Sequence, residues 1–328
     1  MKQILQYLFN HHTLSKAEAK AILTEIAQNK FNDNEVTAFV TVFLMRSITL
    51  AELEGFREAL LNLAVTVDLG THDLVDIVGT GGDGKNTFNI STLSAFIVSG
   101  AGQTVGKHGN YGVSAISGSS NVLEELGYQF KADAAGLQRD LERGNICFLH
   151  APLFHPALRS VAPLRKGLGL RTFFNVLGPL VNPAKPNFSM IGVYNLEIAR
   201  IYQYLLQKKD PDFLLVHGLD GYDEISLTGD TKIFSKSGEH IYSAQQLGFQ
   251  SIQAEELSGG NSKKEAAEVF MKILLGEGTA AQRAVVLANA AMALKTTGKF
   301  GSYEECLAMA KESLDSGNAL KSLKNIIK

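Results

Sequence analysis

The stretch from residue 75 to residue 92 constrains the fold more than any other part of this chain. A short apolar run at residues 74–78, with one Asp inside it, is followed by four glycines within six residues: Gly79, Gly81, Gly82 and Gly84. A polar run then opens a helix-like segment. A strand, a glycine loop and a helix start form a phosphate site in α/β proteins, because backbone N–H groups and the helix dipole point at one anion. The stretch therefore predicts an α/β fold with a phosphate-binding site.

The pattern on either side of this stretch predicts two kinds of architecture. Residues 1–66 carry apolar residues at three- and four-residue steps, and the pairs Ser15/Glu18, Asn32/Glu35 and Thr49/Glu52 are typical of helix starts. From residue 74 onward, predicted strands (74–78, 104–107, 146–149, 189–193, 213–218) alternate with helices, and residues 231–234 and 240–243 suggest a hairpin with its turn at residues 236–239. Such alternation is typical of a mostly parallel sheet flanked by helices. The tail from residue 263 is predicted to be helical.

We therefore expect an α/β protein made of a small all-helical domain, residues 1–66, and a larger domain, residues 67–328, with a mostly parallel central sheet. The proline-rich stretch 151–186 is expected to be a shaped connecting segment, and its part near 160–185 is expected to join the helical domain. Four short helices cannot bury their apolar stripes alone, so the helical domain must pack on the rest of the chain or on a second copy.

Composition excludes several classes of protein. The 328 residues are 45% hydrophobic with a formal charge of −2, which is ordinary for a globular protein and gives no support for broad nucleic-acid binding. The two cysteines, Cys147 and Cys306, are too few for a disulfide framework or a zinc site and are expected to be buried thiols. No apolar run approaches the ~18 residues of a membrane span. We expect no membrane association and a cytoplasmic location.

The glycine loop matches two known phosphate motifs incompletely. Gly79-x-Gly81-x-x-Gly84 fits the dinucleotide fingerprint, but the next strand ends in Lys107, which has the wrong charge for a ribose hydroxyl. Gly79-x4-Gly84-Lys85 nearly fits the Walker A loop, but Asn86 stands where a Ser or Thr binds Mg²⁺. What remains is a phosphate-rich ligand that meets backbone N–H groups and the side chains of Asn89, Ser91 and Thr92.

Two further clusters point to the same kind of ligand. Lys107-His108-Gly109-Asn110, followed by Ser114 and by a Ser-Gly-Ser-Ser run at a helix start, could hold a second phosphate. Asp223-Glu224 follows a strand, where paired carboxylates repel unless a cation lies between them. Carboxylates that share a divalent ion with substrate phosphates are a usual Mg²⁺ arrangement. A solvated acidic turn is the simpler explanation for such a pair in isolation, and Asp220 fits it.

A fourth cluster is basic and lies in the proline-rich stretch. Arg159, Arg165, Lys166 and Arg171 could line an anion site, and Arg suits a carboxylate because its fork binds both oxygens. Ordinary surface charge is the alternative for most of them. The sequence does not show which one binds.

Taken together, residues 79–92, 107–127 and 155–183 and the pair Asp223-Glu224 closely resemble the anthranilate phosphoribosyltransferase family, and the resemblance extends along essentially the whole chain. It implies transfer of phosphoribose from 5-phosphoribosyl diphosphate to the amine of anthranilate in tryptophan biosynthesis, without a covalent protein nucleophile. It also implies Mg²⁺ and a homodimer, which we expect to form through the helical domain. Pyrimidine nucleoside phosphorylases share the layout, but their phosphate loop differs and they lack the Asp-Glu pair.

The resemblance also implies the residues of each subsite. The 5-phosphoribosyl diphosphate site would comprise Gly79, Gly81, Gly82, Asp83, Thr87, Asn89, Ser91, Thr92, Lys107 and Ser119. The anthranilate site would comprise Gly79, His108, Asn110 and Arg165, with Arg165 facing the carboxylate, and the metal site Ser91, Asp223 and Glu224.

The chain departs from the family pattern at a few positions close to the predicted acceptor site. Many relatives have Arg where this chain has Tyr111, Ser where it has Ala115, and Ala-Asp where it has Ser120-Asn121. Tyr111 adjoins Asn110, so this departure bears on the fit of the acceptor and not on that of the donor. A nucleoside phosphorylase and a non-catalytic nucleic-acid-binding relative stay as alternatives. The second would need a strongly basic chain without the metal pair.

Overall fold

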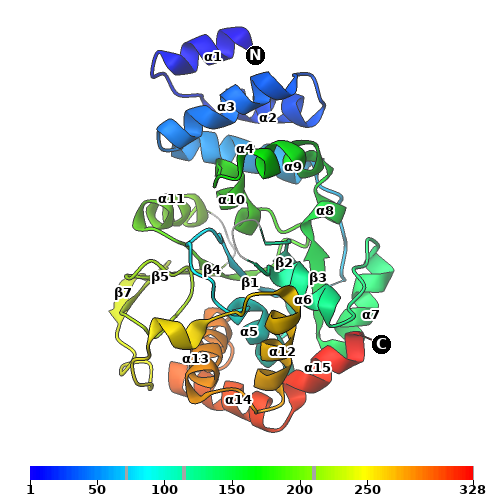
Figure 1. Cartoon of the computed structure of the whole chain (residues 1–328), viewed down its shortest axis with the longest axis vertical. Coiled ribbons are helices and arrows are strands. Elements are labelled where there is room, and N and C mark those ends of the chain that lie inside the picture. Colours follow the sequence, from blue (N-terminus) through cyan, green and yellow to red (C-terminus); the bar gives the residue numbers. More distant parts are fainter. Residues whose placement is uncertain (71–72, 113–115, 209–211, 328) are drawn as a thin grey trace.

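A computed structural model describes residues 1–70, 73–112, 116–208 and 212–327. Helices α1 (Lys2–Phe9), α2 (Lys16–Ala27), α3 (Asp33–Met45) and α4 (Leu50–Leu63) form a bundle at one end of the molecule (Figure 1). Ser15, Asn32 and Thr49 cap α2, α3 and α4, and each accepts a hydrogen bond from the backbone N–H of the Glu three residues later. The predicted helix starts are therefore confirmed at residue level.

The rest of the chain is built on one seven-stranded sheet in the order β3-β2-β1-β4-β5-β6-β7. The strands are β1 (Val75–Gly79), β2 (Val105–Gly109), β3 (Ile146–His150), β4 (Phe188–Gly192), β5 (Asp212–Gly218), β6 (Thr231–Ser235) and β7 (Gly238–Tyr242). The first five pair in parallel, and the hairpin β6–β7 adds antiparallel strands at one edge. The predicted mostly parallel sheet is confirmed.

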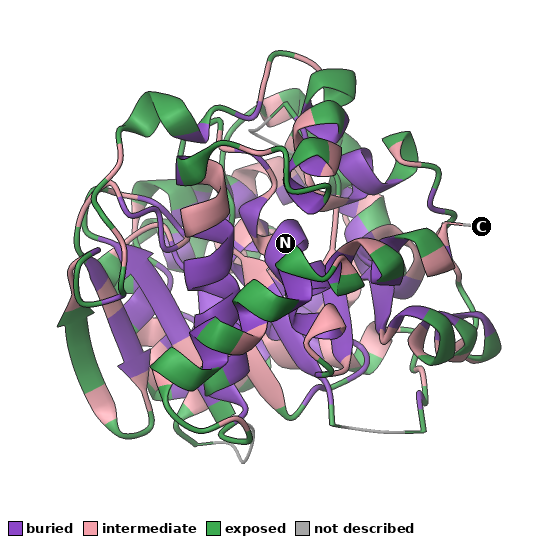
Figure 2. Ribbon diagram, turned by 90° about the horizontal axis from the view of Figure 1, so that it is seen from below, coloured by how far each residue is buried: buried purple, intermediate pink, exposed green. Residues whose placement is uncertain are grey.

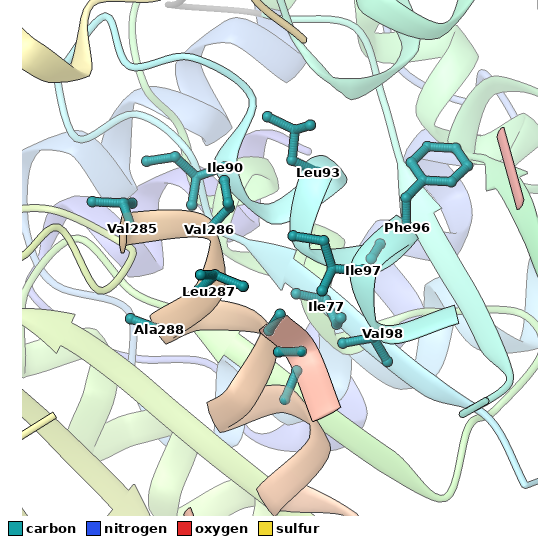
Figure 3. Packing of buried hydrophobic residues seen from close by; sticks show 14 of the residues in the cluster. Ile77, Ile90, Leu93, Phe96, Ile97, Val98, Val285, Val286, Leu287 and Ala288 are labelled. Atoms are coloured by element: carbon teal, nitrogen blue, oxygen red, sulfur yellow. The ribbon is translucent and has the colours of Figure 1, made fainter. Parts of the chain in front are cut away.

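Helices cover the sheet and bury its faces. They are α5 (Ile90–Gly100), α6 (Ser119–Glu125), α7 (Ala134–Gly144), α11 (Leu196–Leu206), α12 (Lys263–Leu274), α13 (Ala280–Thr296), α14 (Tyr303–Asp315) and α15 (Asn318–Ile326), and a short 3-10 turn, η2, spans Ala254–Leu257. Buried residues concentrate in the strands and in the helix faces turned to them (Figure 2). Figure 3 shows Ile90 and Ile97 of α5 beside Val286 and Leu287 of α13, which together form the core under β1. Cys147 and Cys306 are free and buried, as expected.

The proline-rich stretch is more regular than a connecting segment. It folds into α8 (Ala151–Phe154), α9 (Pro156–Leu168), α10 (Phe173–Leu177) and the 3-10 turn η1 (Gly178–Leu180), and Pro163 stands inside α9. Phe173 of α10 stacks on Phe56 of α4 with ring centroids 4.7 Å apart and meets the edge of Phe43 of α3. The apolar stripes of the N-terminal helices are thus covered largely by this stretch of the same chain. No helix among the described residues is long and apolar enough to cross a membrane.

Candidate active site

A cavity of about 240 Å³ opens at the carboxyl ends of β1 and β2, below α9 and α10. Parallel strands end at this edge of an α/β sheet, which is where such folds bind ligands. The cavity is lined by all the residues predicted for the donor, the acceptor and the metal: Gly79, Gly81, Gly82, Asp83, Thr87, Asn89, Ser91, Thr92, Lys107, His108, Asn110, Ser119, Arg165, Asp223 and Glu224. Ser114 and Ala115 lie outside the described residues. The individual roles stay predictions.

The glycine loop between β1 and α5 is shaped by its backbone and anchored from behind. Gly81, Gly82 and Gly84 have φ angles of +63°, +75° and +76°, which side chains rarely tolerate. Asn86 fixes the second half of the loop: its side-chain Nδ2 donates to the Gly260 carbonyl at 2.8 Å, and its own carbonyl accepts from the Gly259 N–H at 2.8 Å. Asn86, which breaks the Walker pattern, therefore holds the loop in place.

The Asp223-Glu224 pair reaches across to this loop rather than facing solvent. Asp223 Oδ2 accepts a hydrogen bond from the Gly81 N–H at 2.7 Å, and Glu224 Oε1 accepts one from the Ser91 N–H at 3.0 Å, in the first turn of α5. Asp223 is only 8% exposed, so the solvated-turn alternative fails for this pair. It holds for Asp220, which accepts from the Thr228 hydroxyl and does not line the cavity.

Two glycines make this approach of Asp223 possible. A Cβ on Gly79 would lie 2.4 Å from Asp223 Oδ2, and a Cβ on Gly192 would lie 1.6 Å from the Asp223 carbonyl oxygen. Gly79 and Gly192 are paired neighbours on β1 and β4. The loop that carries the acidic pair therefore rests directly on glycine backbone, with no room for any side chain.

The charges of the acidic pair are poorly stabilised by the protein alone. Burial, followed by repulsion from Asp83, raises the pKa of Asp223 to about 7. Burial and the neighbouring Asp223 raise the pKa of Glu224 well above its ordinary value. A cation at this point would relieve both effects, and oxygen donors of this kind suit a hard divalent ion.

The donor set is small for a metal bound by protein alone. Within the described ranges, no three His, Cys, Asp or Glu side chains gather to form a metal cage. The predicted set of two carboxylates and the Ser91 hydroxyl fits Mg²⁺, because that ion usually takes one or two carboxylates and fills the rest of its shell with water and substrate phosphate oxygens.

Lys107 lies under the phosphate loop and is almost completely buried. Its ammonium donates to the Ile77 carbonyl and lies 3.4 Å from the Ser91 hydroxyl oxygen. Burial lowers the pKa of Lys107, and the charge that opposes this effect most strongly is that of Asp76. The position of the lysine at the end of β2 brings its charge to the base of the cavity.

Asp76 is a residue that sequence reasoning missed. It appeared only as a polar interruption of an apolar strand, which by itself signals nothing. Its Oδ1 accepts the His108 backbone N–H at 3.1 Å and its Oδ2 accepts the Asn182 side-chain amide at 2.8 Å. Burial raises its pKa to about 6 although Lys107 opposes the shift. Asp76 thereby ties the end of β2 to β1 directly below the cavity.

His108 presents a defined tautomer to the other end of the cavity. Its Nδ1 lies 3.0 Å from the Gly178 carbonyl oxygen. A carbonyl only accepts, so Nδ1 carries the proton and Nε2 has a free lone pair. Nε2 is buried and has no protein partner. Burial, with a smaller contribution from His155, lowers the pKa of His108 to about 3, so the ring stays neutral.

Of the four basic residues between positions 159 and 171, only Arg165 lines the cavity. Its Nη2 donates to Asn175 Oδ1 at 3.4 Å, its guanidinium lies 5.6 Å from the centroid of the Phe174 ring, and its Nε has no protein partner. Arg159 bonds the Pro152 carbonyl instead. Thr80, Asn175 and Pro179 also line the cavity, and sequence reasoning did not single them out.

The residues at which this chain differs from the family pattern form hydrogen bonds with neighbouring residues. The Tyr111 hydroxyl donates to Glu124 at 2.6 Å, and the Asn121 side-chain oxygen accepts the backbone N–H groups of Gly112 and Gly118, each at 3.0 Å. Ser120 Oγ lies 2.8 Å from His150 Nδ1. These hydrogen bonds tie Tyr111 and Gly112 to α6 and its N-terminus, and Tyr111 itself lines the cavity.

Comparison with known families matches both parts of the chain. Residues 2–64 match the helical bundle domain of a glycosyl transferase family, and residues 71–320 match the α/β domain of the same family. An anthranilate phosphoribosyltransferase from Christiangramia forsetii is 52% identical over 100% of this chain and 99% of its own.

Solved structures agree with the sequence match. The crystal structure of anthranilate phosphoribosyltransferase from Thermus thermophilus has a TM-score of 0.90 at 31% identity and covers 98% of each chain. The Saccharomyces cerevisiae enzyme in complex with PRPP and Mg has a TM-score of 0.89 at 28% identity, covering 98% of this chain and 95% of the yeast chain. The yeast enzyme has also been solved with 4-fluoroanthranilate, with a TM-score of 0.87, 27% identity and the same coverage.

Proposed function

Because the chain belongs to the anthranilate phosphoribosyltransferase family, we propose that it transfers the 5-phosphoribosyl group of 5-phosphoribosyl diphosphate (PRPP) to the amine of anthranilate and releases diphosphate, a step of tryptophan biosynthesis. The observation that supports this most directly is the convergence of the glycine loop, the Asp223-Glu224 pair and Arg165 on one cavity. These elements supply, in this order, a phosphate-binding loop, a cation site and a side chain that binds a carboxylate.

The donor half of the cavity binds the phosphates of PRPP. Ser91, Asp223 and Glu224 would hold Mg²⁺, in line with the yeast relative solved with PRPP and Mg. Bound there, the ion would neutralise charge on the departing diphosphate. Lys107 adds a buried positive charge at the base of the cavity, where little water screens it. Electrostatic stabilisation of this kind is usually the largest catalytic contribution.

The acceptor half orients anthranilate by its two polar groups. Arg165 faces the carboxylate, and its Nε, which has no protein partner, is available for one of the oxygens. The lone pair of His108 Nε2 accepts an N–H of the amine, because the Gly178 carbonyl holds the proton on Nδ1. The amine lone pair is then left free to attack the ribose carbon.

The chemistry needs no protein nucleophile. As the bond from ribose C1 to diphosphate breaks, positive charge develops on the sugar and negative charge on the leaving group, and the aromatic amine forms the new bond to C1. Holding the two substrates in line lowers the activation barrier, because their translational and rotational entropy is lost on binding and not in the reaction step. This contribution reaches roughly 7–11 kcal/mol in well-oriented systems. The cavity is enclosed between the sheet and helices α9 and α10. This enclosure excludes water, which would otherwise attack the same carbon.

In this proposal the chain has two domains that meet at the cavity. Residues 1–66 form the helical domain, completed by a segment near 160–185, and residues 67–328 form the α/β domain. The support is a hydrophobic cluster that joins Phe39 and Phe56 of the N-terminal helices to Phe173 of α10. The linkage places Arg165 on the helical side and the phosphate loop on the sheet side, so relative motion of the domains would open and close the site.

We also propose a homodimer that forms through the helical domain. Tyr7 and Phe9 of α1 and Leu44 and Met45 of α3 are exposed apolar residues on this domain. A dimer that forms through this domain would cover these apolar side chains. Sedimentation equilibrium at working concentration should give twice the mass of the chain, and a monomeric mass would contradict the dimer.

One assay tests the activity. Purified protein, PRPP and MgCl₂ are mixed with anthranilate, and the loss of anthranilate fluorescence is followed. We expect turnover that stops when PRPP is omitted. Absence of turnover would refute the assignment. Phosphorolysis of uridine or thymidine by inorganic phosphate in a parallel reaction would favour a nucleoside phosphorylase.

A further inference from the structure

Lys85 is the cation of the glycine loop itself. Its side chain is half-buried and lines the cavity. The ammonium lies 4.6 Å from the centroid of the Tyr222 ring, and no carboxylate among the described residues forms an ion pair with it. The Lys85 backbone N–H donates to Asp83 Oδ1 at 3.0 Å. The main chain of the residue is thus fixed, while its ammonium lies over the Tyr222 ring and near enough to Asp83 for its charge to oppose the burial that raises the pKa of that carboxyl.

We propose that Lys85 leaves the Tyr222 ring when PRPP binds and contacts the diphosphate group, and that it returns to the ring after diphosphate leaves. This inference rests on the function proposed above and adds a donor-binding residue to it. The ring offers the ammonium only the weak negative potential of its face. A diphosphate oxygen carries a full negative charge and accepts a charge-assisted hydrogen bond, so it is the stronger partner for the ammonium.

The position of Lys85 in the loop supports the proposal. Gly79-x4-Gly84-Lys85 has the Walker A spacing, in which the lysine reaches the outer phosphates of a nucleotide. The motif fails only at the next residue, Asn86, whose side chain is bonded to Gly260 and anchors the loop. The metal-binding hydroxyl of a Walker loop has its predicted counterpart in Ser91. The loop therefore keeps the lysine of the motif and supplies the metal-binding hydroxyl from elsewhere.

The charged residues around the cavity also support a phosphate-binding role for Lys85. The charged side chains that line it are three cations, Lys85, Lys107 and Arg165, and three carboxylates, Asp83, Asp223 and Glu224. Lys107 is fixed by the Ile77 carbonyl, and Arg165 belongs to the acceptor end. PRPP brings negative charge at both of its phosphate ends. Among these described residues, Lys85 is the cation on the donor side with a flexible side chain and no ion pair.

The test is direct binding of inorganic diphosphate with MgCl₂, measured by calorimetry on the full-length protein, together with steady-state KM values for both substrates. For Lys85→Gln we expect diphosphate affinity to fall about tenfold and the KM for PRPP to rise by a similar factor, while the KM for anthranilate changes less than twofold. Lys85→Arg, which keeps the charge, should recover most of the diphosphate affinity.

Lys232→Gln is the matched control. Lys232 of β6 also lies over a ring, 4.9 Å from the centroid of Phe234, and does not line the cavity. Its replacement removes the same charge, and we expect diphosphate binding to stay unchanged. The proposal is overturned if Lys85→Gln binds diphosphate within twofold of the wild type, if Lys232→Gln weakens binding equally, or if both KM values rise together.

These outcomes separate the two proposals. A wild-type protein that does not consume anthranilate refutes the proposed activity whatever Lys85 does. A wild-type protein that turns over normally, combined with unchanged diphosphate binding in Lys85→Gln, refutes only the role of the lysine.

Discussion

Gly192 lies at the end of β4 and does not line the cavity, yet it should control the predicted metal site. In Gly192→Ala the new Cβ would lie 1.6 Å from the Asp223 carbonyl oxygen, whereas ordinary contact begins at 3.4 Å. The Asp223 backbone would have to retreat by about 1.8 Å, the difference between these two distances. Gly192 also accepts the Thr80 N–H at 2.9 Å, so the start of the glycine loop would be disturbed as well.

A misplacement of about 1 Å in a catalytic arrangement can cost on the order of 100-fold in rate. We therefore expect kcat/KM to fall at least about 100-fold in Gly192→Ala and the rate to need more MgCl₂ for saturation. The measurement is the initial rate of anthranilate consumption over a MgCl₂ titration. Circular dichroism and thermal unfolding would verify that the variant is folded.

Gly106→Ala is the matched control, because Gly106 is a glycine inside another parallel strand of the same sheet, β2. Its Cβ would lie 3.2 Å from Leu74 Cδ1, the end of a flexible side chain that can yield by a few tenths of an ångström. We expect a lower Tm but an unchanged MgCl₂ requirement. If Gly192→Ala keeps the wild-type kcat/KM and the wild-type MgCl₂ dependence, then the position of Asp223 against β4 does not matter and the reasoning fails.

Three further predictions concern the cavity itself. Asp223→Asn combined with Glu224→Gln should abolish Mg²⁺-dependent turnover without unfolding the protein, and near-normal rates would refute the metal assignment. Arg165→Ala should raise the KM for anthranilate far more than that for PRPP in steady-state kinetics; an equal rise would move Arg165 out of the acceptor site. The lowered pKa of His108, about 3 against about 6.5 unfolded, gives stability that is complete above pH 6.5 and is lost as the pH falls toward 3. Urea unfolding should therefore show the wild type losing about 2 kcal/mol more than His108→Gln between pH 7 and pH 5, and equal losses would contradict a neutral buried ring.

The features that sequence reasoning predicted well are those set by local physics. The side chains of Ser15, Asn32 and Thr49 each reach a backbone N–H only three residues away, so the starts of α2, α3 and α4 could be predicted to the residue. Strands of the parallel sheet stood out as short, mainly apolar runs that alternate with helical segments. The hairpin was less well predicted: its turn was expected at residues 236–239, but Gly238 already pairs with Ser235.

The helices of the proline-rich stretch were not predicted, because their stability comes from distant contacts. Pro163 inside α9 argues locally against a helix. Helices α3 and α4 nevertheless hold this stretch in place, because its residues Leu158 and Phe173 share a hydrophobic cluster with Phe39 and Phe56 of those helices. The same packing decides which basic side chain enters the cavity. Arg165 could not be distinguished from its neighbours without it.

The acidic pair shows that sequence motifs can predict which residues belong to a site but not how those residues are arranged. Asp223 meets the Gly81 N–H across 142 residues of sequence, and that approach depends on bare backbone at Gly79 and Gly192. The arrangement buries carboxylates whose raised pKa values show that the fold alone disfavours their charge. The folded protein therefore carries an electrostatic cost that a bound cation would offset. A site preorganised in this way is less stable empty than occupied, so ligands that neutralise Asp223 and Glu224 should also stabilise the fold.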